Sequence, residues 1–142
     1  MTLAELEAMI EKDSIIDPSD LGGEALKISM LHSKYYSLFM KELKASRAAD
    51  FVFAEVKKRR THYYLGKADD ETYQKETLDF KVLKADLELY LEADRELTEA
   101  DIRRQNQRMK SEMLEAFVKS INQRSFNIKN AIEWRRFTAG LN

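Results

Sequence analysis

The sequence predicts a mainly α-helical protein organised around one very long helix, with further helices at its C-terminal end. One proline and four glycines among 142 residues leave few helix breakers. Charged residues make up 35% and hydrophobic residues 44%, a mix typical of helices with long exposed faces. Apolar residues also recur about every 3.5 positions through residues 18–65. The length fits one domain that spans residues 1–142.

The composition excludes several classes of function. A chain without cysteine forms neither disulfides nor thiolate metal sites, which fits a reducing cytoplasm. No apolar run approaches the ~18 residues of a membrane span, and the acidic N-terminus is unlike a secretory signal. Neither His32 nor His62 has carboxylates at a spacing that indicates a shared site. The sequence contains no phosphate-binding glycine loop and no motif of a catalytic nucleophile. We therefore expect no enzymatic activity, metal, cofactor or membrane contact.

A short helix is predicted over residues 3–12, because Thr2 and Glu5 form a capping box at its start. A connector follows this helix. Asp17 and Pro18 are then typical of an N-cap and the first residue of the next helix.

The long helix is predicted over residues 18–65. Such a helix would extend ~70 Å at about 1.5 Å per residue, more than a small domain needs. It is too long to bury its apolar seam within its own chain, so we expect the seam to pack against a second copy. The two seam positions are filled by Leu21, Ile28, Tyr35, Ala49, Val56 and Tyr63, and by Leu31, Leu38, Ala45 and Val52.

Residues 66–79 are predicted to be an acidic loop. Through residues 82–94 apolar and polar side chains then alternate, which is the pattern of a strand. The same residues also fit a helix, which leucine, glutamate and lysine prefer. We predict an extended segment within residues 80–95 and keep a helix as the alternative.

The C-terminal region, residues 98–139, is predicted to be helical. It opens at Thr98, is interrupted near residues 123–125 and ends at Gly140 as a C-cap. Its apolar residues suit core packing, oligomerisation or both. The candidates for oligomerisation are Phe117, Ile121, Phe126, Ile128, Ile132, Trp134 and Phe137.

Charge alternates in blocks along the chain, although the net charge is only −1. Residues 1–26 and 68–97 each carry a net charge of −6, whereas residues 27–67 carry +7 and residues 98–142 carry +4. A polyanion responds to the nearest block, because salt screens charges beyond ~8 Å. The acidic pI near 6.2 therefore does not exclude a nucleic acid as partner.

Residues 57–67 combine four consecutive cations with two adjacent tyrosines and a glycine. Cations neutralise phosphates and aromatic rings stack on bases, so the stretch is a candidate site for single-stranded nucleic acid. Cations near a helix end also offset the helix dipole, and a glycine there is the usual stop signal, so a purely structural role fits too. The candidate DNA-binding residues are Lys57, Lys58, Arg59, Arg60, Tyr64 and Lys67.

Several short motifs follow one another in order along nearly the whole chain. They are Leu3, Glu5, Leu6 and Lys12-Asp13, then Ile16-Asp17, Met30-Leu31, Ser33-Lys34, Lys58-x-Arg60-x-x-Tyr63-Tyr64-x-Gly66, Val82-Leu83-x-Ala85-Asp86, Arg124-x-Phe126-x-Ile128-Lys129 and Arg136-Phe137-x-Ala139-Gly140. In this order they resemble the UvsY-type recombination mediators of T-even-like bacteriophages. The chain departs from that pattern between about residues 95 and 120, where it is longer by several residues.

The resemblance implies a non-enzymatic protein that binds single-stranded DNA as a ring of six or seven subunits. Members of that family help a RecA-like phage recombinase to replace the phage single-stranded DNA-binding protein, in the cytoplasm of the infected bacterial host. Carried over to this chain, the family's DNA contacts fall on Lys58 and Arg60, and its assembly region falls on residues 126–137. The alternative is a structural or adaptor coiled-coil oligomer that does not bind nucleic acid.

Overall fold

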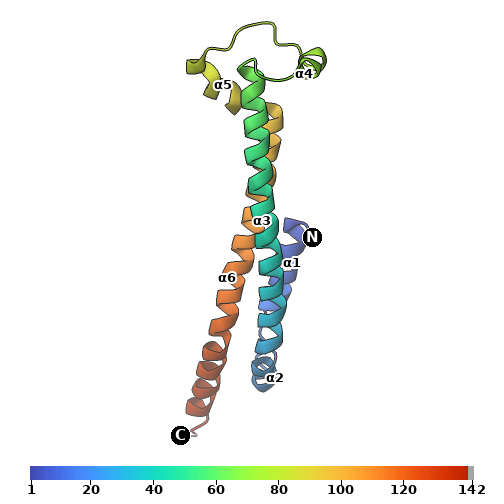
Figure 1. The fold of residues 1–142 in the computed structure, drawn as a ribbon. Helices are drawn as coiled ribbons and strands as arrows, with labels where there is room; N and C mark the ends of the chain where they lie inside the picture. The colour runs from blue at the N-terminus through green and yellow to red at the C-terminus, as the bar shows by residue number, and fades with distance from the viewer. Residues whose placement is uncertain (141–142) are drawn as a thin grey trace. The chain divides into compact units, whose positions relative to one another are not determined.

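The computed structural model describes residues 1–140, which form helices and contain no strand (Figure 1). The elements are α1 (Leu3–Ser14), α2 (Leu21–Leu26), α3 (Ile28–Tyr64), α4 (Asp70–Lys75), the short 3₁₀ helix η1 (Lys84–Asp86), α5 (Leu87–Glu92) and α6 (Arg95–Thr138). Residues 1–43 and 108 onward form one compact unit, and residues 44–107 form a second. The prediction of a mainly helical fold with one long helix is confirmed.

Helix α1 begins as its capping box predicts. The Thr2 hydroxyl accepts a hydrogen bond from the Glu5 amide at 3.1 Å, and the Glu5 carboxylate accepts one from the Thr2 amide at 2.9 Å. These two bonds satisfy backbone donors that the helix itself leaves unpaired.

The predicted start of the long helix at Asp17 and Pro18 is wrong. The Asp17 carboxylate instead closes a turn by accepting from the Ser19 amide at 2.9 Å and the Ser19 hydroxyl at 2.6 Å. Asp20 is the N-cap, because its carboxylate accepts from the Gly23 amide at 3.1 Å. The helical region therefore consists of the short α2 and the 37-residue α3, which begins at Ile28. Two glycines inside α2 weaken helix formation there.

The end of α3 is a glycine cap, as the sequence predicts. Gly66 has a φ of 75°, which favours glycine over other residues. The Lys67 amide donates to the His62 carbonyl at 2.8 Å, and the Gly66 amide donates to the Tyr63 carbonyl at 3.2 Å. This pair of bonds is the Schellman pattern, which satisfies carbonyls at the end of a helix.

The core of the first unit is formed by α1, α3 and α6. Tyr35 is fully buried, meets Phe117 edge to face at 4.6 Å between ring centroids, and donates its hydroxyl proton to Asp13 at 2.6 Å. Arg124 of α6 donates to the carbonyls of Asp13 and Ser14 at 2.8 and 2.9 Å. The buried cluster consists of Leu6, Leu31, Tyr35, Leu114, Phe117, Val118 and Ile121. The prediction that the seam needs a second copy is thus wrong for its residues Leu31 and Tyr35, because α1 and α6 cover them.

The predicted extended segment at residues 82–94 is wrong. Helix α5 forms there, and its apolar residues follow a helical rather than an alternating pattern: Leu91 is 3% exposed, whereas Leu89, two positions earlier, is 66% exposed. A strand would have placed these two leucines on one face. The predicted acidic loop also contains a helix, α4, which Asp69 caps by accepting from the Thr72 amide at 2.9 Å.

Helix α6 begins earlier than Thr98 and continues through residues 123–125 without the predicted interruption. Its first turn is capped by Asp94, whose carboxylate accepts from the Leu97 amide at 2.8 Å. Gly140, with a φ of 75°, follows its last turn as predicted. None of the helices within residues 1–140 is long and apolar enough to cross a membrane.

Candidate nucleic-acid interface

The last turns of α3 carry most of the candidate DNA-binding residues, and they meet α4, α5 and the start of α6 within the second unit. Arg60 lies at the centre of this region with only 6% of its surface exposed. Its Nε donates to Asp94 at 2.7 Å, and its two terminal nitrogens donate to the Glu76 carboxylate at 2.8 and 3.1 Å. A fork of this kind is the strongest pairing that arginine makes with a carboxylate.

The two tyrosines that follow Arg60 complete this network. The guanidinium carbon of Arg60 lies 4.3 Å from the Tyr63 ring centroid and 5.3 Å from that of Tyr64. The Tyr64 hydroxyl donates to Asp94 at 2.7 Å. Tyr73 of α4 stacks on Tyr63 at 5.4 Å and donates its hydroxyl proton to the Tyr63 carbonyl at 2.8 Å. Arg60 therefore joins the end of α3 to the end of α4 and to the residue before α6, instead of facing solvent.

The charges in this network are stabilised by their hydrogen bonds. Burial alone would lower the pKa of Arg60, but its bonds to Glu76 and Asp94 outweigh burial and keep the pKa above its usual value. Burial alone would raise the pKa of Asp94, but hydrogen bonds from the Leu97 amide and Tyr64 outweigh it, so this pKa lies below its usual value. The ionised forms of both residues are thus the ones that the fold favours.

Arg59, the neighbour of Arg60, makes an exposed ion pair with Glu96 at the start of α6. Both terminal nitrogens of Arg59 donate to this carboxylate, one of them at 3.0 Å. The hydrogen bond from Arg59 holds the pKa of Glu96 below its usual value. Two of the four consecutive cations are therefore paired with carboxylates of the acidic block that follows them in sequence.

The candidate residues that remain accessible are three lysines. Lys57, Lys58 and Lys67 are exposed, and none of them forms an ion pair with the residues that the structure describes. Lys57 borders a pocket of about 250 Å³ whose lining also contains Glu88 and Glu92, so acidic side chains reduce its field. Lys58 and Lys67 do not line that pocket. The structure thus separates the basic stretch into two arginines that are paired with carboxylates and three lysines that are exposed and form no ion pair with the described residues.

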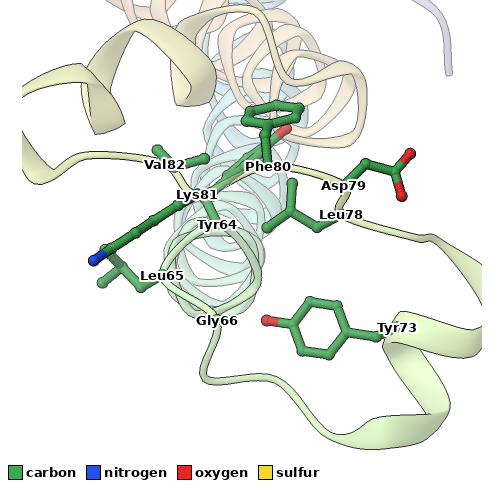
Figure 2. A pocket seen from close by; sticks show the side chains of 9 residues that line it. All are labelled: Tyr64, Leu65, Gly66, Tyr73, Leu78, Asp79, Phe80, Lys81 and Val82. Atoms are coloured by element: carbon green, nitrogen blue, oxygen red, sulfur yellow. The ribbon is translucent and has the colours of Figure 1, made fainter.

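Tyr64, the tyrosine expected to meet a base, is half-buried. Its ring contacts Tyr63 at 5.1 Å and Tyr90 at 5.7 Å between centroids, and its hydroxyl is bound to Asp94. It nevertheless borders a pocket at the end of α3 (Figure 2).

The residues that the sequence reasoning did not single out are Glu76 and Asp94, the carboxylates that hold Arg60. They belong to the block of net charge −6 that follows the block of +7. The signal in the sequence for this pairing is that a block of negative net charge directly follows a block of positive net charge. Within residues 1–140 no cluster of three or more histidine, aspartate or glutamate side chains could hold a metal ion.

The oligomerisation candidates divide into two groups. Phe117, Ile121 and Ile128 are 7%, 1% and 2% exposed, and their burial within one chain favours a role in the core. Four others lie exposed on α6: Phe126, Ile132, Trp134 and Phe137. Trp134 and Phe137 stack on each other, with 5.8 Å between ring centroids. Only this second group is available to contact another subunit.

Comparisons with known proteins agree with one another. The sequence model of one family, described as recombination, repair and ssDNA binding protein UvsY, matches residues 9–141. The recombination protein uvsY of Enterobacteria phage T4 is 28% identical over 143 residues, which cover 99% of each chain.

Solved structures also show similarity to a UvsY protein. A crystal structure of the bacteriophage T4 recombination mediator protein UvsY, lattice type II, matches with a TM-score of 0.86 and 26% identity, covering 98% of each chain. A crystal structure of the same T4 protein in lattice type I matches with a TM-score of 0.82 and 25% identity, covering 94% of this chain and 98% of the other.

The adjacent arginines provide a direct test of the buried network. Arg60→Ala should lower the free energy of unfolding by about 3–5 kcal/mol, because it leaves buried Asp94 without its partner. Arg59→Ala removes an exposed pair and should cost about 1 kcal/mol or less. Urea denaturation of both variants measures the difference. Equal losses would show that Arg60 is not the structural centre described above.

Acid should weaken this part of the fold. The pKa of Asp94 is lower in the folded chain than in the unfolded chain, so the unfolded chain binds a proton there at a higher pH. The stability that ionised Asp94 contributes is therefore lost as the pH falls below about 4. Asp94→Asn keeps an N-cap for α6 but removes the charge. We expect it to be less stable than wild type at pH 7, with the difference shrinking in acid. Asp86→Asn, at an exposed carboxylate, is the control, and a difference independent of pH would contradict the assignment.

Proposed function

The chain belongs to the UvsY family of recombination, repair and single-stranded DNA-binding proteins, and from this premise we propose that it is a non-enzymatic recombination mediator. As a homo-oligomer it would hold single-stranded DNA and help a RecA-like recombinase to replace the phage single-stranded DNA-binding protein. Its place of action would be the cytoplasm of the infected bacterial host.

The observation that carries this proposal is the set of unpaired, exposed lysines at the end of α3. Lys57, Lys58 and Lys67 are exposed and form no ion pair with the described residues, and Lys58 and Lys67 also lie outside the pocket whose Glu88 and Glu92 reduce the field of Lys57. Contacts of lysine with phosphates are independent of base sequence, which is what a protein acting on any strand requires.

The two parts of the basic stretch would have different roles. Arg60 is buried against Glu76 and Asp94, so a phosphate would reach it only by displacing a carboxylate. We assign Arg60 the role of positioning the end of α3 and Lys58 the role of touching the strand. Arg59, whose charge is shared with Glu96, would add little to the attraction.

Oligomerisation would turn a weak site into a useful one. A few lysines per subunit bind a strand loosely, but linking repeated sites raises the overall affinity by about 10²–10⁴. The exposed aromatic pair Trp134 and Phe137 near the end of α6 supports a contact between subunits there. We propose an assembly of six or seven subunits.

Binding of single strands should depend on the exposed lysines. Replacing Lys57 and Lys58 by alanine should weaken binding of a labelled oligonucleotide and lower the slope of log affinity against log salt by about 0.7 for each lost phosphate contact. The control is Lys12→Ala with Lys41→Ala, which removes the same charge from exposed lysines of the first unit that form no ion pair with the described residues. Fluorescence anisotropy across a salt series measures both quantities. Unchanged affinity and slope would favour the structural coiled-coil alternative.

Assembly should depend on the exposed aromatic pair. Trp134→Ala with Phe137→Ala should reduce the mass found by native mass spectrometry from a six- or seven-subunit assembly to smaller species, while the helical content stays unchanged. Leu89→Ala, at another exposed apolar residue, is the control. An assembly of wild-type mass in the double variant would argue against this contact.

A further inference from the structure

A pocket of about 470 Å³ lies at the end of α3, in the second unit. Figure 2 shows residues 78–82 passing the end of the helix, with the Tyr73 ring facing that end from α4. The volume of the pocket lies within the range of about 300–1,000 Å³ that is typical of small-molecule sites. The remaining lining comes from Tyr64, Leu65 and Gly66 of the helix end. Aromatic and aliphatic side chains thus form most of its wall.

A row of aromatic rings ends at this pocket. Neighbouring rings contact each other in the order Tyr73, Tyr63, Tyr64, Tyr90 and Phe80, with centroids 5.1 to 5.7 Å apart. The hydroxyls of Tyr63, Tyr64 and Tyr73 are bound to atoms of the protein. The inner rings are therefore held in place by their own contacts.

Phe80, the last ring of the row, is 53% exposed. Phenylalanine has no polar group that gains from contact with water, so an exposed ring on a pocket wall leaves an apolar face uncovered. The backbone around it is anchored, because Val82, two residues later, is 7% exposed. The Tyr90 ring lies beside Phe80 at 5.5 Å. The exposed face is thus presented in a defined position.

Charged groups stand on two sides of the pocket. Lys81 and Asp79 both line it, and in Figure 2 the ammonium of Lys81 and the carboxylate of Asp79 point to opposite sides. Lys67, exposed and without an ion pair among the described residues, follows Gly66 directly. A ligand with an aromatic body and an attached anion matches an uncovered ring in a pocket that Lys81 lines and that Lys67 follows directly in sequence. A nucleotide of a single strand has this composition.

We propose that this pocket receives one unstacked nucleobase of the bound strand on the face of Phe80, with the adjoining phosphate near Lys67 and Lys81. The inference rests on the proposed function and deepens it, because it adds a site for a base to a surface that otherwise contacts only phosphates. The Asp79 carboxylate is an acceptor for an N–H group of a base, which all four bases carry, including N3–H of thymine.

The test compares strands with and without bases. Phe80→Leu keeps an apolar side chain but removes the ring, and Phe80→Trp keeps a ring. We expect Phe80→Leu to bind an oligo(dT) strand at least about fivefold more weakly, because stacking of a base on an aromatic ring is lost. The same variant should bind an abasic strand of equal length as wild type does, and its salt slope should not change. Phe80→Trp should bind both strands as wild type does.

The control is Phe51→Leu, at an exposed phenylalanine of α3 that does not line the pocket, which should leave both affinities unchanged. Phe80→Leu that binds oligo(dT) like wild type, or that weakens both strands equally, would overturn the base pocket. The proposed function would still stand in either case if the Lys57 and Lys58 variant lost affinity. If that variant also bound normally, the proposed function itself would fall.

Discussion

The second unit depends on the charge of one buried guanidinium. A buried charge is tolerated only when it is paired and its donors are satisfied. Arg60 meets this requirement by drawing Glu76 and Asp94 to the end of α3, and Asp94 in turn caps α6 and binds Tyr64. One side chain of α3 thereby contacts the residue that follows α4, the residue that caps α6 and the rings of Tyr63 and Tyr64.

This arrangement changes which residues of the basic stretch 57–67 can contact phosphates. Four consecutive cations suggest four phosphate contacts, but Arg59 and Arg60 are neutralised by carboxylates of the same chain. The accessible charge resides in the lysines on either side. A signature in sequence can therefore contain both contact residues and the residues that hold the contact surface in place, and their burial and ion pairing in the structure separate the two.

Local signals predicted the fold best. The capping box of Thr2 and Glu5 and the glycine stop at Gly66 involve atoms only a few residues apart, so the sequence around them was sufficient. The prediction of Asp17 as an N-cap is wrong because Asp20, three residues later, takes that role. The prediction of a strand at residues 82–94 is wrong because alternating and helical patterns coincide over so short a segment. The partners of Arg60 are 16 and 34 residues away, and no local pattern identifies them.

The two units also differ in how soon they can form during synthesis. The second is continuous in sequence, from residue 44 to 107, whereas the first joins residues 1–43 to those from 108 onward. Tyr35 needs Phe117, and the end of α1 needs Arg124, so this core stays open until α6 has been translated. Contacts of such sequence separation close slowly. The N-terminal helices must therefore remain soluble, with the apolar residues that α6 covers still exposed, until the segment that begins at residue 108 has been made.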